Sequence, residues 1–96
     1  MIRHLLLFRW TEDSSAEGRA GALKALRAMT ETVPSIRSLA VREALNPGEQ
    51  SFDGLLEVHF DDDAAYRSYL SADSHVAAWK DHLQPVCSAL ASIQVE

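Results

Sequence analysis

Apolar and polar positions along this 96-residue chain fall into alternating strand-like and helix-like stretches. Residues 2–10 are bulky and apolar, and their length and content favour a strand that is covered on both faces. Because side chains alternate across a strand, His4 and Phe8 share one face while Leu5 and Leu7 share the other. Three further strands are predicted at residues 36–45, 52–60 and 89–95.

The first predicted helix lies between the first two strands. It begins at an N-cap serine, Ser14 or Ser15, and runs to about Thr32, because Pro34 blocks continuation. Helical spacing predicts a buried stripe at Leu23, Leu26, Thr30 and Val33.

Two shorter helices are predicted after the third strand. The acidic run at residues 61–63 fits a helix start better than a metal site, because carboxylates cap helices and complement the helix dipole. The helix that follows, about residues 62–71, is expected to point three side chains inward: Tyr66, Tyr69 and Leu70. The chain then breaks near Ala72, and a third helix begins at Asp73 or Ser74.

The order of these elements, β-α-β-β-α-β, is that of a ferredoxin-like α+β domain with an antiparallel four-stranded sheet. At 96 residues the whole chain, 1–96, is expected to be one domain. Helices can cover only one face of such a sheet, yet the other face carries Leu5, Leu7 and Leu55. A two-fold homodimer that packs sheet on sheet would bury those leucines.

Composition narrows the function classes. The formal net charge is −5 and no segment concentrates Lys or Arg, which argues against a nucleic-acid partner. The single cysteine, Cys87, allows no intrachain disulfide and no cysteine-based zinc site. No apolar run reaches the roughly 20 residues of a membrane helix, and the run 5–8 is too short for a secretory signal. The expected location is therefore the cytoplasm, with no membrane contact.

The candidate chemistry lies at the break between the second and third helices, where Tyr69 and His75 flank a turn. An imidazole can act as a base near neutral pH, and a phenol serves better as a hydrogen-bond donor. His4 lies on the strand face that the helices cover, so all three groups can border one pocket. The alternative is a packed core in which His75 caps a helix and Tyr69 is an ordinary buried aromatic.

Taken in order, several segments resemble the stress-responsive A/B barrel (Dabb) family of dimeric α+β barrels. The matching pieces are residues 2–10, 33–39, 56–60, 66–75 and 83–85. The resemblance implies a homodimer whose two sheets form a shared barrel, in a family whose function is mostly undefined. One branch, similar to plant olivetolic acid cyclase, closes a linear polyketide by an intramolecular aldol reaction without a cofactor.

That branch implies roles for particular residues of this chain. Tyr69 and His75 match its catalytic tyrosine and histidine, and His4 matches its first-strand pocket histidine. Its third-strand pocket histidine aligns with Gly54, a departure expected to enlarge the pocket floor and to change the substrate. The proline usual before the helix histidine is Asp73 here, so the loop is expected to be set differently.

Two functions follow from this comparison. The first is a cofactor-independent cyclase or other enzyme acting on a hydrophobic carbonyl compound, with Tyr69 and His75 catalytic and no metal. The residues expected to bind its substrate are His4, Phe8, Gly54, Leu56, Val58 and Trp79. The second is a non-enzymatic stress-response or ligand-binding dimer. A pocket of roughly a few hundred Å³ would favour the first, and a filled core the second.

Polar groups outside that pocket are expected to have other roles. His59 and Glu57 face the proposed dimer interior and are expected to pair with Arg3 or Arg9. A metal-binding function ranks below both others, because only scattered histidines and surface carboxylates support it.

Overall fold

The computed structural model describes residues 1–46, 48 and 51–96. Its elements, in chain order, are β1 (Ile2–Trp10), α1 (Ala16–Thr32), β2 (Ser38–Glu43), β3 (Gly54–Phe60), α2 (Asp63–Ser71), α3 (Asp73–Ala77), the π-helical turn η1 (Ala78–Leu83), the 3₁₀ turn η2 (Gln84–Val86) and β4 (Cys87–Val95). Among the helices so described, none is long and apolar enough to cross a membrane.

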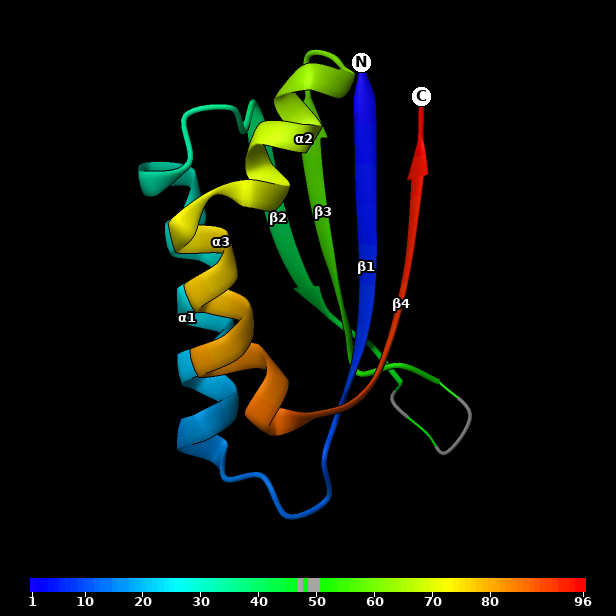
Figure 1. Ribbon diagram of the computed structural model, residues 1–96. Helices are drawn as coiled ribbons and strands as arrows, with labels where there is room; N and C mark the ends of the chain where they lie inside the picture. The colour runs from blue at the N-terminus through cyan, green and yellow to red at the C-terminus, as the bar shows by residue number, and fades with distance from the viewer. Residues whose placement is uncertain (47, 49–50) are drawn as a thin grey trace.

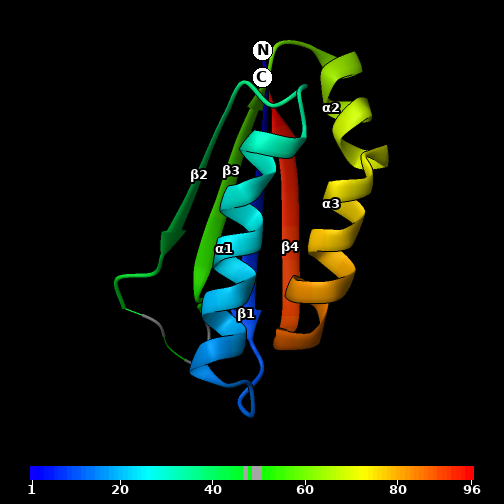
Figure 2. The ribbon, with the colours of Figure 1, turned by 90° about the vertical axis from the view of Figure 1, so that its left-hand side faces the viewer.

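The four strands form one antiparallel sheet in the order β2-β3-β1-β4. The helices lie together on one side of this sheet and leave the other side uncovered (Figure 1). Seen from the helix side, α1 and the α2–α3 segment run next to each other across the strands (Figure 2). The predicted ferredoxin-like α+β fold is confirmed.

Local hydrogen bonds explain where the helices begin. The Ser15 hydroxyl accepts from the Gly18 N–H at 2.9 Å, as expected of an N-cap serine. Asp62 caps α2 in the same way, accepting from the Ala65 N–H at 2.9 Å. The acidic run thus starts a helix, as predicted.

Strand ends differ from the prediction by two residues at most positions. β3 begins at Gly54 rather than at residue 52, and the Asp53 carboxylate accepts from the Trp10 N–H at 2.8 Å. That side-chain bond takes the place of a backbone ladder bond at the end of the sheet. β2 is shorter than predicted, and β4 begins earlier, at Cys87, directly after η2.

The core lies between the sheet and α1, and two predicted core positions are wrong. Thr30 is exposed, because the stripe of α1 continues through Met29 to the buried Val33. Leu70 is 43% exposed, because Tyr69, at 1% exposure, takes the inward position at the end of α2. In each case the neighbouring residue, rather than the predicted one, faces the sheet.

Phe8 and Gly54 are paired across β1 and β3, and Phe8 is fully buried. A Cβ built on Gly54 would lie 2.6 Å from Phe8 Cε2 and 3.0 Å from the Arg42 carbonyl oxygen. The Phe8 ring therefore fills the space above Gly54. The expectation that Gly54 enlarges the pocket floor is wrong for this reason.

Gly54→Ala is expected to destabilise the fold by about 1–3 kcal/mol, because the buried Phe8 ring must shift to admit a methyl group. Gly21→Ala is a matched control: no atom lies within 4 Å of a Cβ there, and alanine in a helix interior should stabilise by about 1 kcal/mol. Urea unfolding of both variants measures the difference. Equal midpoints for the Gly54 variant and the parent would contradict the packing described.

The uncovered face of the sheet is apolar at its centre and polar at one edge. A shallow hollow of ≈ 400 Å³ is lined by Leu5, Leu7, Leu55, Ala91, Ser92 and Ile93. On β3, His59 Nε2 lies 2.5 Å from Glu57 Oε2, and Arg42 lies 4.0 Å from the same carboxylate. The predicted pairing of His59 and Glu57 with Arg3 or Arg9 is thus replaced by a pair between the two residues themselves.

Candidate functional site

The break between α2 and α3 brings Tyr69 and His75 together. Ala72 has extended backbone angles, φ −66° and ψ 134°, and its N–H donates to the Tyr69 carbonyl at 3.2 Å. The chain turns at this point, so a residue in the last turn of α2 faces one in the first turn of α3. The Tyr69 and His75 ring centroids are 4.2 Å apart, with the planes tilted by 46°.

His75 has the protonation expected of a base. Its Nδ1 lies 3.3 Å from the Leu70 carbonyl oxygen, which can only accept, so Nδ1 carries the proton. Nε2 is then left with a lone pair. Burial lowers the pKa of His75, although the bond to Leu70 acts in the opposite direction, and the neutral form is favoured at pH 7.

Tyr69 is a donor rather than a base. Its side chain is almost fully buried, and burial raises the pKa of the phenol well above its usual value, with Tyr66 adding to the effect. The hydroxyl therefore keeps its proton at any pH at which the protein is folded. A neutral imidazole beside a neutral phenol can take one proton and donate another.

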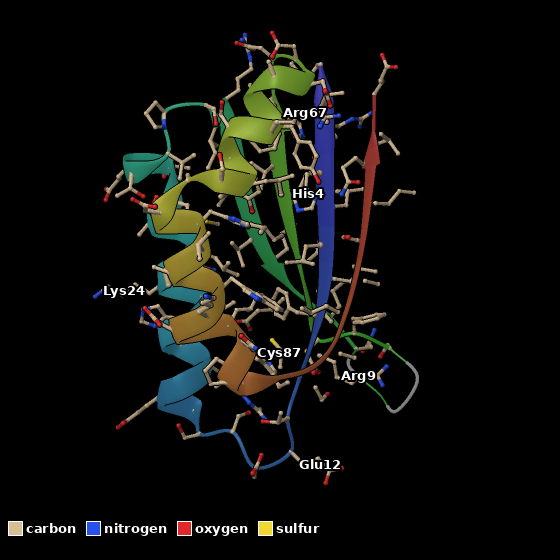
Figure 3. The ribbon with its side chains drawn as sticks, in the orientation of Figure 1. His4, Arg9, Glu12, Lys24, Arg67 and Cys87 are labelled. Carbon is tan, nitrogen blue, oxygen red and sulfur yellow. The ribbon has the colours of Figure 1, made fainter. Side chains whose placement is uncertain are left out.

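His4 approaches the same aromatic group from the sheet. It lies on β1 beneath α2 (Figure 3) and is 7% exposed. Its ring centroid is 5.5 Å from that of Tyr66 and 5.9 Å from that of Tyr69. Burial lowers the pKa of His4, and the nearby His75 lowers it further.

A cavity of ≈ 30 Å³ adjoins the Tyr69–His75 pair. Its walls are Leu6, Leu26, Met29, Leu56, Tyr69, His75, Ala78, Trp79 and Leu83. The volume corresponds to about one water molecule. Of the residues predicted to bind substrate, Leu56 and Trp79 line this cavity, whereas His4, Phe8, Gly54 and Val58 lie outside its lining.

Sequence reasoning missed several members of the site, for different reasons. Leu6 shares a strand face with His4, so alternation alone could have identified it. Gln94, whose amide nitrogen lies 2.8 Å from His4 Nδ1, depends on the β1–β4 register, which no local pattern reveals. His82 is exposed and takes no part in the cavity.

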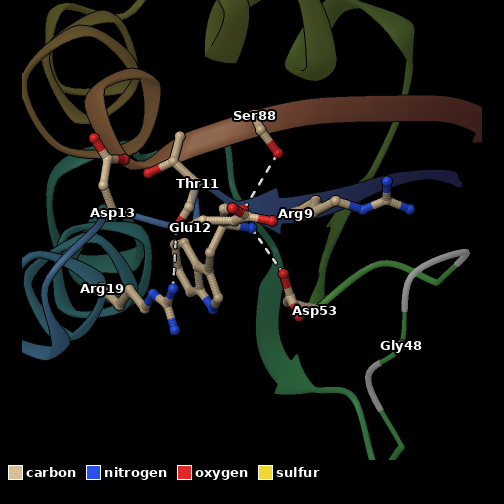
Figure 4. A pocket seen from close by; sticks show the side chains of 9 residues that line it. Arg9, Thr11, Glu12, Asp13, Arg19, Gly48, Asp53 and Ser88 are labelled. Atoms are coloured by element: carbon tan, nitrogen blue, oxygen red, sulfur yellow. Dashed lines mark hydrogen bonds between the residues drawn. The ribbon is translucent and has the colours of Figure 1, made fainter.

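A larger hollow at the other end of β1 is open to solvent and polar (Figure 4). Its groups bond to one another: the Trp10 N–H donates to Asp53 at 2.8 Å, and Arg19 donates to the Thr11 carbonyl at 3.0 Å. These bonds hold the end of the sheet against α1. Within the described residues no group of three or more His, Cys, Asp or Glu side chains could hold a metal ion.

Stability should depend on the two lowered histidine pKa values. Below about pH 6.5 the unfolded chain binds protons that the folded protein resists, so the free energy of unfolding should fall as the pH is lowered from 7.5 to 5.5. Replacing His4 with glutamine removes one such group, so the variant should show a shallower slope. Urea titrations at several pH values measure it. A slope unchanged from the parent would contradict a buried neutral His4.

A ferredoxin-like α+β domain with a tyrosine–histidine pair under a broken helix is the class that fold and site define. The family model for the Stress responsive A/B Barrel Domain matches residues 2–96, and the chain belongs to that family. No curated protein sequence matches it.

Solved structures of similar fold include a dimeric protein of unknown function from Bacteroides fragilis. It is 24% identical, with a TM-score of 0.80 over 99% of this chain and 94% of the other. A Dabb family protein from Mesorhizobium loti is 20% identical, with a TM-score of 0.83 over 99% and 94% of the two chains. The hydroxynitrile lyase of Passiflora edulis is 14% identical, with a TM-score of 0.87 over 98% and 90%. At these identities the likeness establishes the fold.

Proposed function

We propose that this chain is a homodimeric, cofactor-independent enzyme that acts on a hydrophobic, polyketide-like carbonyl compound. The observation that carries the proposal is the contact between Tyr69 and His75 at the edge of a cavity, the imidazole with a free Nε2 and the phenol with its proton. This is the pairing that enolisation needs, a base for the carbon acid and a donor for the oxygen.

In the proposed reaction His75 Nε2 takes the proton α to a carbonyl, and the C–H electron pair becomes that of an enolate. The Tyr69 hydroxyl donates a hydrogen bond to the enolate oxygen as charge develops there. The enolate carbon then attacks a second carbonyl of the same molecule, forming one C–C bond. The new alkoxide takes the proton back from the His75 imidazolium, so no external reagent is consumed.

A substrate of this size requires the ≈ 30 Å³ cavity to expand. The segment best suited to move is η1, because π-helical turns are uncommon and are frequent at functional sites. It carries Ala78, Trp79 and Leu83, three of the cavity walls. Phe8 and Val58, both fully buried behind the site, and the Gly54 backbone would support the sheet side of the enlarged pocket.

The homodimer is proposed from the uncovered sheet face. Leu7 and Ile93 are exposed there, and the hollow between them is almost entirely apolar. A similarly folded relative from Bacteroides fragilis is dimeric. Packing two such faces together would bury both hollows and leave the Tyr69–His75 sites on the outer, helical side of each sheet.

A panel of linear poly-β-keto acids and thioesters tests the enzyme directly. We expect at least one to be converted to a cyclic product of mass lower by one water or equal to the substrate, detected by mass spectrometry. The control is Tyr69→Phe, which keeps the ring and removes the hydroxyl.

The small cavity also favours a second function, a non-enzymatic dimer whose site is a packed core. In that case the panel yields neither binding nor product, although the dimer persists. Saturable binding of any panel member together with product formation would eliminate this second function.

A further inference from the structure

His4 has a hydrogen-bond partner that no sequence pattern indicated. β1 pairs with β4 so that His4 and Gln94 face each other, and Gln94 Nε2 lies 2.8 Å from His4 Nδ1. Gln94 is exposed, near the end of β4, while the histidine ring is buried among Tyr66 and Tyr69. The bond therefore joins a buried ring to the rim of the sheet.

A glutamine amide nitrogen can donate but cannot accept. His4 Nδ1 must therefore carry a lone pair, and in the neutral ring the proton lies on Nε2. His75 has the opposite arrangement, since its Nδ1–H donates to the Leu70 carbonyl. The two histidines around Tyr69 thus differ in what Nε2 offers, a donor on His4 and an acceptor on His75.

We propose that Gln94 is a positioning residue that holds His4 as the Nε2–H tautomer, so that His4 donates a hydrogen bond to a substrate oxygen and leaves proton abstraction to His75. This division rests on the proposed function for its meaning in catalysis. The tautomer itself rests only on the Gln94–His4 contact. It would explain why two histidines near one tyrosine do not compete for the same proton.

The surroundings of His4 agree with a neutral ring. The titratable side chains that face it are Tyr66 and Tyr69 from α2 and His75 from α3, and none of them carries a negative charge at pH 7. No carboxylate in the described residues hydrogen-bonds to it. The identity of residue 94 is therefore the strongest local determinant of which nitrogen is protonated.

Long-range ¹H–¹⁵N NMR of histidine-labelled protein reads both tautomers without a substrate, with His4 assigned from its absence in His4→Gln. We expect the parent to show His4 protonated at Nε2 and His75 at Nδ1. Gln94→Glu places an acceptor at the same position, so His4 Nδ1 should become protonated and the His4 pKa should rise. His75 and the exposed His82 serve as internal controls and should keep their parent signals.

A His4 ring protonated at Nδ1 in the parent would overturn the proposal, and this result does not depend on any variant folding. An unchanged His4 tautomer in a folded Gln94→Glu protein would also overturn it. Failure of the substrate panel, by contrast, would remove the proposed enzyme and leave the tautomer assignment standing.

Discussion

Replacing Leu7 with aspartate is expected to convert the dimer into a folded monomer of 10.6 kDa. Leu7 is 38% exposed at the centre of the uncovered sheet face and lines its apolar hollow. In the proposed dimer an aspartate there would bury a charge with no partner, at a cost on the order of several kcal/mol. Sedimentation velocity at micromolar concentration measures the change.

Leu70→Asp is the matched control for this experiment. Leu70 is 43% exposed on the outer side of α2, away from the sheet face, so its replacement should leave the dimer intact. Circular dichroism should show both variants folded. A monomeric parent, or a Leu7→Asp protein that sediments like the parent, would contradict the dimer.

His75→Ala should lower turnover by 10²–10⁴-fold, the usual effect of removing a general base. The reason is the free Nε2 of His75, which no other group in contact with Tyr69 replaces if His4 is protonated there. Steady-state rates on any panel substrate that turns over measure the effect. His82→Ala is the control, because His82 is exposed and lies outside the cavity.

Tyr69→Phe separates catalysis from packing in the same assay. The ring contacts with His75 and Phe60 are retained and only the hydroxyl is lost. We therefore expect kcat to fall with little change in KM. Equal rates for the parent and His75→Ala would remove His75 from the mechanism.

The fold could be predicted from sequence because its signals are local. Alternation in β1 placed His4 and Phe8 on the helix side, and the cap at Asp62 marked the start of α2. The errors at Thr30 and Leu70 are shifts of one residue around a helix. Such shifts depend on how the helix rolls on the sheet, which is decided by packing rather than by spacing.

The site was less predictable because it depends on contacts between distant segments. The Gln94–His4 bond requires the register of the first and last strands. The volume above Gly54 depends on the position of the Phe8 ring, which a sequence comparison of single positions does not include. The size of the cavity likewise reflects the packing of nine side chains from several elements.

Binding of a linear medium-chain β-diketone, followed by aromatic ¹H–¹³C NMR, tests the central claim most directly. The ligand has the carbonyl groups and the apolar tail that the site is proposed to accept. We predict saturable shifts of Tyr69, His75 and Trp79, which line the cavity, and unchanged signals of Trp10, which lies outside it. Shifts confined to the sheet face, or no saturable shift at Tyr69 and His75, would contradict a carbonyl-binding site under the broken helix.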